Sequence, residues 1–272
     1  KFQPLHPKKF PLENIIFSVY LPNRDPEPRV AHRKYNDTYR LNAYETHYKK
    51  LIDSKRDYAK SIGCKFEMFQ SLGGFETKMG ITHLSKFDQI NFYKLYLMEE
   101  LAKTYDNILY LDFDVIPTTT ENFFDTHDMS VGIHVKSSIP HDVDKVVAKR
   151  TRPSIRSPFA KYWNLHCMQN LSFIDCEVTV FNTGIVGSNA EFIKDLDYFG
   201  DFENDLKLME ECKTDEMYLM NTIFGTDNET LFGYKILKNQ VPWVSLDDRW
   251  HHIYDEDPLG GAKFVHVINK KF

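Results

Sequence analysis

The stretch Ile108-Leu109-Tyr110-Leu111-Asp112-Phe113-Asp114 decides the fold class of this 272-residue chain. A continuously apolar run is typical of a central parallel strand that is covered on both faces. Two carboxylates follow it directly, and alternate side chains of an extended segment point to the same side. Ligands of open α/β sheets bind at the carboxyl ends of the strands. The segment therefore predicts a buried parallel strand with a site at its end.

Further apolar runs predict strands on both sides of this segment, at 15–20, 64–69, 131–135, 177–187 and 264–268. Helical periodicity predicts a long amphipathic helix over 41–62 that stops at Gly63. A second helix is expected from the Ser85–Asp88 capping sequence to about Thr104, and a third over 215–224. Alternating strands and helices indicate an α/β fold with a mostly parallel central sheet flanked by helices.

The chain divides by composition into an arm, one large domain and a basic segment within that domain. Residues 1–13 are rich in Lys and Pro and predict an N-terminal arm, while 14–272 predict a single α/β domain. Basic side chains crowd the segment 136–172, among them Arg152, Arg156 and Lys161. We interpret this segment as an insertion over the sheet edge that determines specificity.

Composition excludes several classes of protein. The net charge of −5 gives no global sign of nucleic-acid binding. Four cysteines without a CxxC pair argue against a zinc ribbon. No window approaches the ~20 apolar residues of a membrane span. Because the sequence starts at Lys1, two locations stay open, the cytoplasm and the lumen, the latter for a catalytic domain whose N-terminal anchor was trimmed.

The acidic pair Asp112 and Asp114 is the strongest chemical signal. Two like charges held close together repel each other and need a cation or a shared proton. A hard divalent ion with oxygen ligands meets that need, and it would stabilise a diphosphate as a leaving group. The alternative is a pair of aspartates that only cap a turn or a helix.

Lys94, Asn182 and Gly184 are weaker candidates. Lys94 lies in the middle of an apolar helical stripe, so it either snorkels to solvent or meets an anion in a cleft. Asn182 and Gly184 interrupt an apolar run, which indicates either a bulge or close approach of the backbone to a ligand.

The C-terminal half adds three more candidates. Asp215 and Glu216 begin a predicted helix, where acids either oppose the macrodipole or contact a sugar and assist the acceptor. His266 lies in a late apolar strand and is either a core histidine or a ligand. The run Trp250-His251-His252 either packs or offers an aromatic platform for a sugar.

At these residues the chain resembles the glycogenin and lipopolysaccharide galactosyltransferase family, whose members are retaining enzymes with the GT-A fold. Tyr93-Lys94-Leu95 is similar to the family's Tyr-Arg-Leu helix, with Lys in place of Arg. The strand before Asp112-Phe113-Asp114 and the segment Phe181-Asn182-Thr183-Gly184 also resemble family motifs. Asp215-Glu216 falls where the family has Asp-Gln, and His266 falls where it has a metal-binding His.

The resemblance implies a Rossmann-like GT-A glycosyltransferase that holds Mn²⁺ (or Mg²⁺) between Asp112, Asp114 and His266. Its donor would be a nucleotide sugar, with a UDP-sugar expected, and its acceptor a saccharide or protein-linked glycan. We expect Tyr20, Lys94, Gly184 and Lys270 on the donor side, and Asn182, Asp215 and Glu216 at the reacting sugar. The resemblance favours retention of configuration. An inverting enzyme would instead need a carboxylate base, for which Asp215 and Glu216 are the candidates.

Two alternatives remain at this stage. Phosphohydrolases of the haloacid-dehalogenase type also carry Asp-x-Asp after an apolar strand, and Asp247-Asp248 imitates their second acidic motif. In those enzymes, however, the motif normally opens the domain. A non-catalytic carbohydrate-binding module is the other alternative.

Overall fold

The computed structural model describes residues 13–22, 37–138, 158–212, 225–253, 260–268 and 272. The strands are β1 (Asn14–Val19), β2 (Lys65–Phe69), β3 (Asn107–Leu111), β4 (Val115–Pro117), β5 (Ile133–Ser138), β6 (Val180–Asn189), β7 (Trp243–Ser245), β8 (His252–Ile253) and β9 (Phe264–His266). The helices are α1 (Asp37–Ser61), α2 (Phe75–Lys78), α3 (Lys86–Leu101), α4 (Phe123–Thr126), α6 (Pro158–Leu171), α7 (Ala190–Leu196), α8 (Phe202–Glu211) and α9 (Asn228–Lys238). None of these helices is long and apolar enough to cross a membrane.

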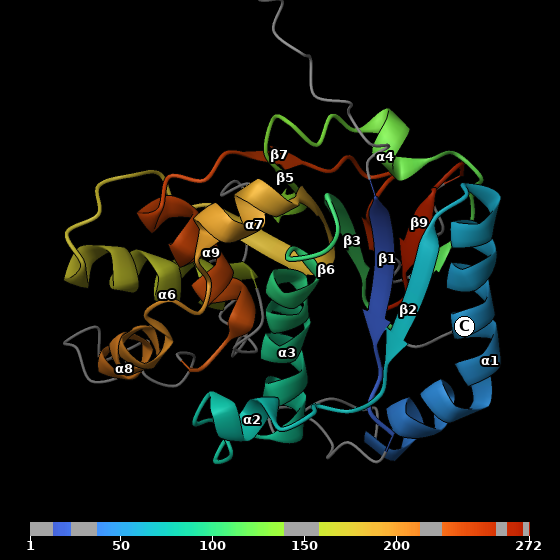
Figure 1. Cartoon of the computed structure of the whole chain (residues 1–272). Helices are drawn as coiled ribbons and strands as arrows, with labels where there is room; N and C mark the ends of the chain where they lie inside the picture. Colours follow the sequence, from blue (N-terminus) through green and yellow to red (C-terminus); the bar gives the residue numbers. More distant parts are fainter. Residues whose placement is uncertain (1–12, 23–36, 139–157, 213–224, 254–259, 269–271) are drawn as a thin grey trace, which may run out of the picture.

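A six-stranded sheet in the order β2-β1-β3-β6-β5-β7 forms the centre (Figure 1). Strands β1, β2 and β3 pair in parallel, as do β5 and β7. Strand β6 lies between these two groups and is antiparallel to both β3 and β5. The sheet is therefore mostly parallel, as the sequence predicts, with one reversed strand beside β3.

The two central strands are covered on both faces. Ile108 and Tyr110 of β3 belong to one apolar cluster, whereas Leu109 and Leu111 belong to another. In β1, Ile15 alternates with its neighbours in the same way, so the period-2 pattern of each strand sorts its side chains between two layers. The continuously apolar sequence 108–111 is explained by this double burial.

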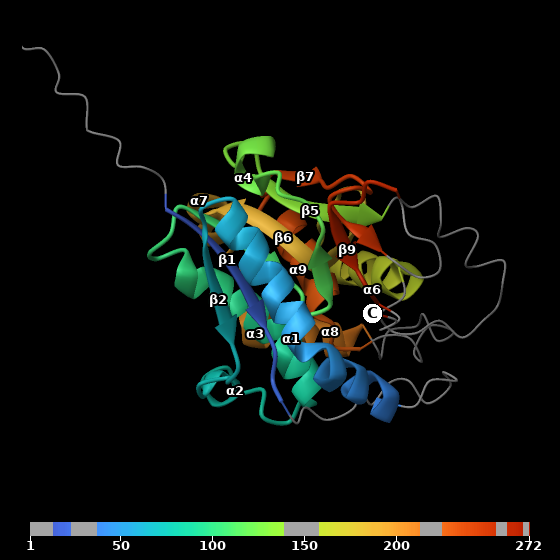
Figure 2. The ribbon, with the colours of Figure 1, turned by 90° about the vertical axis from the view of Figure 1, so that its right-hand side faces the viewer.

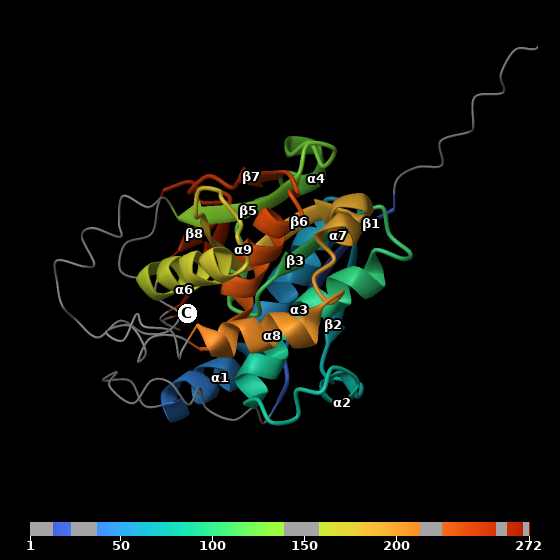
Figure 3. The ribbon, with the colours of Figure 1, turned by 90° about the vertical axis from the view of Figure 1, so that its left-hand side faces the viewer.

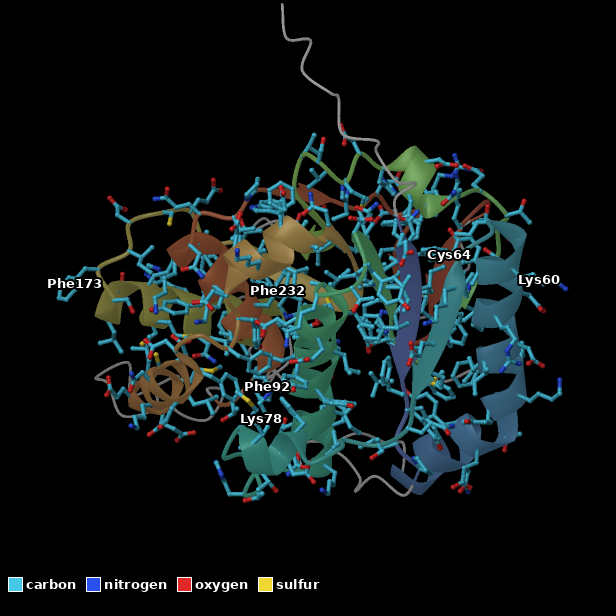
Figure 4. The ribbon with its side chains drawn as sticks, in the orientation of Figure 1. Lys60, Cys64, Lys78, Phe92, Phe173 and Phe232 are labelled. Atoms are coloured by element: carbon cyan, nitrogen blue, oxygen red, sulfur yellow. The ribbon has the colours of Figure 1, made fainter. Side chains whose placement is uncertain are left out.

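Helix α1 covers one face of the sheet, and helices α3, α6, α7, α8 and α9 lie on the other. Figure 2 shows α1 crossing in front of the strands, and Figure 3 shows α6 and α8 on the opposite side. In Figure 4, Phe92 and Phe232 lie within the layer of α3 and α9, and both are fully buried. Phe173, after α6, points away from the molecule and is 96% exposed.

The predicted helix boundaries hold where the capping chemistry is local. Helix α1 ends at Ser61, and Gly63 adopts φ +67° while the amide of Cys64 donates to the Ala59 carbonyl at 2.8 Å. A left-handed residue after a helix favours glycine. Helix α3 begins after Ser85, whose side chain accepts from the Asp88 amide.

The apolar strand expected at 264–268 does not belong to the central sheet. It forms β9, which pairs with β4 and β8 in a second, three-stranded sheet of order β4-β9-β8. The register sets Val115 opposite His266. Because β4 follows Asp114 directly, this small sheet brings the end of the described chain to the acidic pair.

The basic segment 136–172 is not uniformly a solvated surface. Lys161, on α6, is buried and forms an ion pair with the equally buried Glu229 of α9. It is therefore a structural cation and is not free to contact an acceptor. Arg152, Arg156 and the predicted helix over 215–224 lie outside the described residues, as does the arm 1–13 except for Glu13.

His127, which follows α4, lies in an aromatic cluster away from the acidic pair. Its ring centroid is 4.4 Å from that of Phe123 and 5.0 Å from those of His134 and Trp250. Burial, reinforced by His134, lowers the pKa of His127 to about 4. The folded protein therefore binds a proton at His127 less tightly than the unfolded chain does, since histidines in an unfolded chain titrate near pH 6.5.

Stability should fall as the pH drops from about 6.5 to about 4, because only the unfolded chain protonates His127 in that window. Replacing His127 with Phe should flatten this dependence by about 2–3 kcal/mol over the window. Urea unfolding of the protein in chelator at several pH values measures it, with the exposed His83→Phe as the matched control. Identical pH slopes for His127→Phe and the unaltered protein would contradict the assignment.

Candidate functional site

The acidic pair lies in a turn and not in an extended segment. Strand β3 ends at Leu111, and the Val115 amide donates to the Asp112 carbonyl at 3.0 Å, which closes a four-residue turn. Strict strand alternation is therefore the wrong reason for the convergence of the two carboxylates. The intervening Phe113 stacks on Tyr20 with ring centroids 4.3 Å apart, and this aromatic contact anchors the turn.

Asp112, Asp114 and His266 meet at one point. One ligand atom from each lies within 4.8 Å of the others. The His266 Nε2 is 3.4 Å from Asp114 Oδ1 and 3.7 Å from Asp112 Oδ2. Two carboxylates and one imidazole suit a divalent ion such as Mn²⁺, which takes oxygen ligands and accepts nitrogen. The donor set and its spacing thus fit the ion that the sequence predicts.

Backbone hydrogen bonds tie the three contributing segments together. The Asp112 amide donates to the Gly184 carbonyl at 2.7 Å, which joins the turn to β6. The Val267 amide donates to the Asp114 carbonyl at 3.0 Å, which joins the turn to the end of β9. Backbone positions set by these bonds do not depend on the charges of the side chains, so the site is preorganised.

Lys94 points into the site. It is 1% exposed, and its Nζ lies 3.3 Å from Asp112 Oδ1 and donates to the Thr183 carbonyl at 3.0 Å. Of the two alternatives that the sequence left open, snorkelling to solvent is wrong. Its anionic neighbour in this state is the Asp112 carboxylate, whose side chain is 25% exposed.

Two tyrosine hydroxyls also donate to the acidic pair. Tyr44 of α1 donates to Asp114 Oδ2 at 3.2 Å, and Tyr110 of β3 donates to Asp112 Oδ1. Burial and the Asp112 charge raise the pKa of Tyr110 well above its usual value, so its proton is retained. Each carboxylate is therefore oriented by a neutral hydroxyl donor on one oxygen, while its other oxygen faces the His266 Nε2.

Lys55 of α1 holds the backbone of the turn through hydrogen bonds. It is fully buried, and its Nζ donates to the carbonyls of Phe113 at 2.8 Å and Val115 at 2.6 Å. Burial lowers the pKa of Lys55 to about 7, against the opposing pull of Asp114 and Asp112. The residue thus fixes the backbone on both sides of Asp114.

Gly184 gives the His266 ring its place. A Cβ added there would lie 2.6 Å from the His266 Nδ1, closer than real contacts allow. The sequence left a bulge and a close approach to a ligand as alternatives. The structure has a break in the β5–β6 register next to this glycine, between Asn182 and Val186, and the group that approaches Gly184 is the His266 ring. The neighbouring Asn182 turns its Oδ1 back to accept from the Gly184 amide at 2.9 Å, so its side chain shapes this bend.

Thr183 joins the site to α9. Its amide donates to Glu229 Oε1 at 2.6 Å, and its hydroxyl accepts from the Asn228 amide group at 3.1 Å. Glu229 is also the partner of Lys161. The start of α9 therefore holds the backbone whose carbonyl receives Lys94.

The remaining sequence candidates have different outcomes. Tyr20 lies next to the acidic turn, stacked on Phe113 and 7% exposed. Trp250 and His251 are buried at 3% and 0%, so the sugar-platform interpretation is wrong for both. Asp215, Glu216 and Lys270 lie outside the described residues.

Sequence reasoning missed Tyr44, Lys55, Tyr110 and His251 as parts of the site. Lys55 carried the same signal as Lys94, since it lies one helical turn after Leu51 in the apolar stripe of α1. His251 was considered only as part of an aromatic platform for a sugar and not as a neighbour of His266. It is buried, and its Nε2 lies 3.1 Å from the His266 Nδ1.

The model of the protein family described as glycosyl transferase family 8 matches residues 20–270. The chain belongs to this family. The match covers every described residue of the acidic turn, the β6 bend and β9, so all of these segments belong to the glycosyltransferase domain.

Three solved glycosyltransferase structures are similar to this chain, and the first of them shows the same fold. Mouse xyloside xylosyltransferase 1 is 12% identical, with coverage of 96% of this chain and 100% of that chain, at a TM-score of 0.50. A glycosyltransferase involved in glycosylation of the major capsid of PBCV-1 is 14% identical, with 93% coverage of each chain and a TM-score of 0.45. The galactosyltransferase LgtC, solved with donor and acceptor sugar analogs, is 10% identical, with coverage of 94% and 87% and a TM-score of 0.43. No curated protein matches the chain.

Family membership sets the phosphohydrolase alternative aside. The structure agrees, because Asp247 Oδ1 accepts from the amides of Arg249 and Trp250 at 2.9 Å each, and Asp248 pairs with Lys136. Both aspartates of the imitated motif are thus engaged in their own loop and with β5.

Replacing Gly184 with Ala should displace the His266 ring and weaken Mn²⁺ binding by about 10- to 100-fold, because the new methyl group occupies the space of the ring. Mn²⁺ titration followed by electron paramagnetic resonance of the free ion measures this. Gly260→Ala is the matched control, since a Cβ there meets nothing within 4 Å. Unchanged Mn²⁺ affinity in Gly184→Ala would show that His266 does not depend on this space.

Proposed function

We propose that this glycosyltransferase uses a divalent ion, Mn²⁺ or Mg²⁺, to transfer a sugar from a nucleoside-diphosphate sugar, with a UDP-sugar as the first candidate. The acceptor would be a saccharide or a protein-linked glycan, and the anomeric configuration would be retained. The observation that carries the proposal is the convergence of Asp112, Asp114 and His266 within 4.8 Å. Membership of glycosyltransferase family 8 supplies the class of reaction.

The bound ion would supply Lewis-acid stabilisation of the negative charge that develops on the leaving diphosphate. Asp112 is the more exposed carboxylate, at 25% against 7% for Asp114, and would be the one nearer to the donor. Lys94 would move its hydrogen bond from Asp112 to a phosphate oxygen once the ion neutralises that carboxylate. Tyr110 and Tyr44 would keep the two carboxylates oriented throughout.

Retention is favoured by the chemistry of the described residues near the bend of β6. Inversion needs a free carboxylate base on the far side of the sugar. The carboxylate that accepts from the Thr183 amide is that of Glu229, which is 5% exposed and paired with Lys161. Glu229 is therefore poorly placed to act as such a base. Asp215 or Glu216 remains the base that an inverting enzyme would use, and proton NMR of the product anomer separates the two mechanisms.

A thermal-shift panel of nucleotide sugars, each with and without Mn²⁺, tests the donor. A ligand at a hundred times its Kd raises the free energy of unfolding by about 2.7 kcal/mol. The true donor should raise the melting temperature only with the ion present, and the nucleoside diphosphate should appear as product when acceptor glycans are added. Metal-dependent binding with no turnover on any acceptor would favour a non-catalytic carbohydrate-binding role.

Asp112→Asn and Asp114→Asn should each abolish the Mn²⁺ dependence and lower turnover by on the order of a thousandfold, since several kcal/mol of leaving-group stabilisation is lost. Folding should persist, because each amide keeps its tyrosine donor. Activity assays across an Mn²⁺ titration, with circular dichroism as the folding control, measure this. Full activity of the unaltered enzyme in excess chelator would contradict the proposed metal dependence.

Lys94→Ala should weaken donor binding by roughly tenfold or more, and Lys94→Arg should retain more of it, because guanidinium also binds phosphate oxygens. The readout is the donor-induced thermal shift at saturating Mn²⁺. Lys235→Met is the comparison, because Lys235 is an equally buried lysine that pairs with Asp205 of α8 and not with the acidic turn. Normal donor affinity in Lys94→Ala would assign Lys94 to structure alone.

A further inference from the structure

His251 is a buried histidine that directly contacts a candidate metal ligand. Its side chain is 0% exposed, and its Nε2 lies 3.1 Å from the His266 Nδ1. The two rings are nearly parallel, with centroids 5.3 Å apart and an interplanar angle of 30°. His251 lies on the side of the His266 ring that faces away from Asp114, whose Oδ1 is 3.4 Å from the opposite nitrogen, Nε2.

The backbone of His251 is fixed from two directions. Its amide donates to the Asp247 carbonyl at 3.0 Å, and its carbonyl accepts from the Lys136 Nζ at 3.1 Å. Strand β8 starts at the next residue and pairs with β9, so that Ile253 is opposite His266. The His251 ring is thus held against His266 by the small sheet and does not depend on an ion.

The proton arrangement follows from the geometry. A histidine that ligates an ion through Nε2 keeps its own proton on Nδ1 and must donate it to an acceptor. The atom in place here is the Nε2 of His251, which accepts only when the proton of His251 is on Nδ1. Its Nδ1 has no hydrogen-bond partner in the part of the chain that the structure describes, so the contact with His266 decides the tautomer.

We propose that His251 is a positioning residue for the metal centre: it holds the Nδ1-protonated tautomer, accepts from His266 Nδ1 and thereby aims the His266 Nε2 lone pair at the ion. This inference rests on the proposed metal-dependent function. It adds a residue that touches neither donor nor ion, and it makes a histidine the acceptor where carboxylates, carbonyls or water are usual.

Three variants test the role through Mn²⁺ affinity, read by electron paramagnetic resonance of the free ion. His251→Phe keeps the ring volume without an acceptor and should lower the affinity by about 10- to 100-fold. His251→Gln places an oxygen near the Nε2 position and should recover part of it. His134→Phe is the matched control, because His134 is also buried, at 3% exposure, but its Nε2 contacts the Asp128 carbonyl. That variant should keep the Mn²⁺ affinity of the unaltered protein.

The tautomer is measured directly on the unaltered protein, which keeps the proposal testable if His251→Phe does not fold. Long-range nitrogen–proton NMR of the protein loaded with Cd²⁺, a diamagnetic substitute for Mn²⁺, should show His251 protonated on Nδ1. Protonation on Nε2, or unchanged Mn²⁺ affinity in both His251 variants, overturns the inference. Absence of Mn²⁺ binding by the unaltered protein would instead overturn the proposed function on which it rests.

Discussion

The site is built around one constraint: two carboxylates that repel each other are held together at the end of a buried strand. Their ligand oxygens lie within 4.8 Å of each other. At an effective dielectric constant of about 20, that separation costs at least about 3 kcal/mol. The surrounding residues offset this cost before any ion binds. Lys94 pairs with Asp112, while Tyr110 and Tyr44 donate one hydrogen bond to each carboxylate.

The fold keeps the two aspartates together through backbone hydrogen bonds, which do not depend on the charges of the carboxylates. The turn is bonded to Gly184 on one side and to Val267 on the other, and Lys55 holds the carbonyls on both sides of Asp114. Segments distant in sequence therefore meet at the acidic pair: α1, α3, the turn after β3, the bend of β6, and β9. A site built in this way presents its ligands in nearly fixed positions, so an ion need not organise the protein when it binds.

Much of this arrangement is predictable from sequence because its causes are local. The apolar run 108–111 predicts a doubly covered strand. A lysine within an apolar helical stripe narrows its place to two alternatives, snorkelling to solvent or contact with an anion, and the structure decides between them. The turn at Asp112–Val115 is not predictable in this way, since the carbonyl of Gly184 and the amide of Val267 hold it from far along the chain. His251 escapes for the same reason, because its contact with His266 exists only through the pairing of β8 with β9.

The central claim is that Asp112, Asp114 and His266 form one divalent-ion site. Anomalous diffraction from a crystal soaked in Mn²⁺ without donor tests it most directly. We expect a single strong anomalous peak within coordination distance of a carboxylate oxygen of Asp112, a carboxylate oxygen of Asp114 and the Nε2 of His266. A peak elsewhere, or one that leaves out His266 while its Nε2 still contacts Asp114, would contradict it.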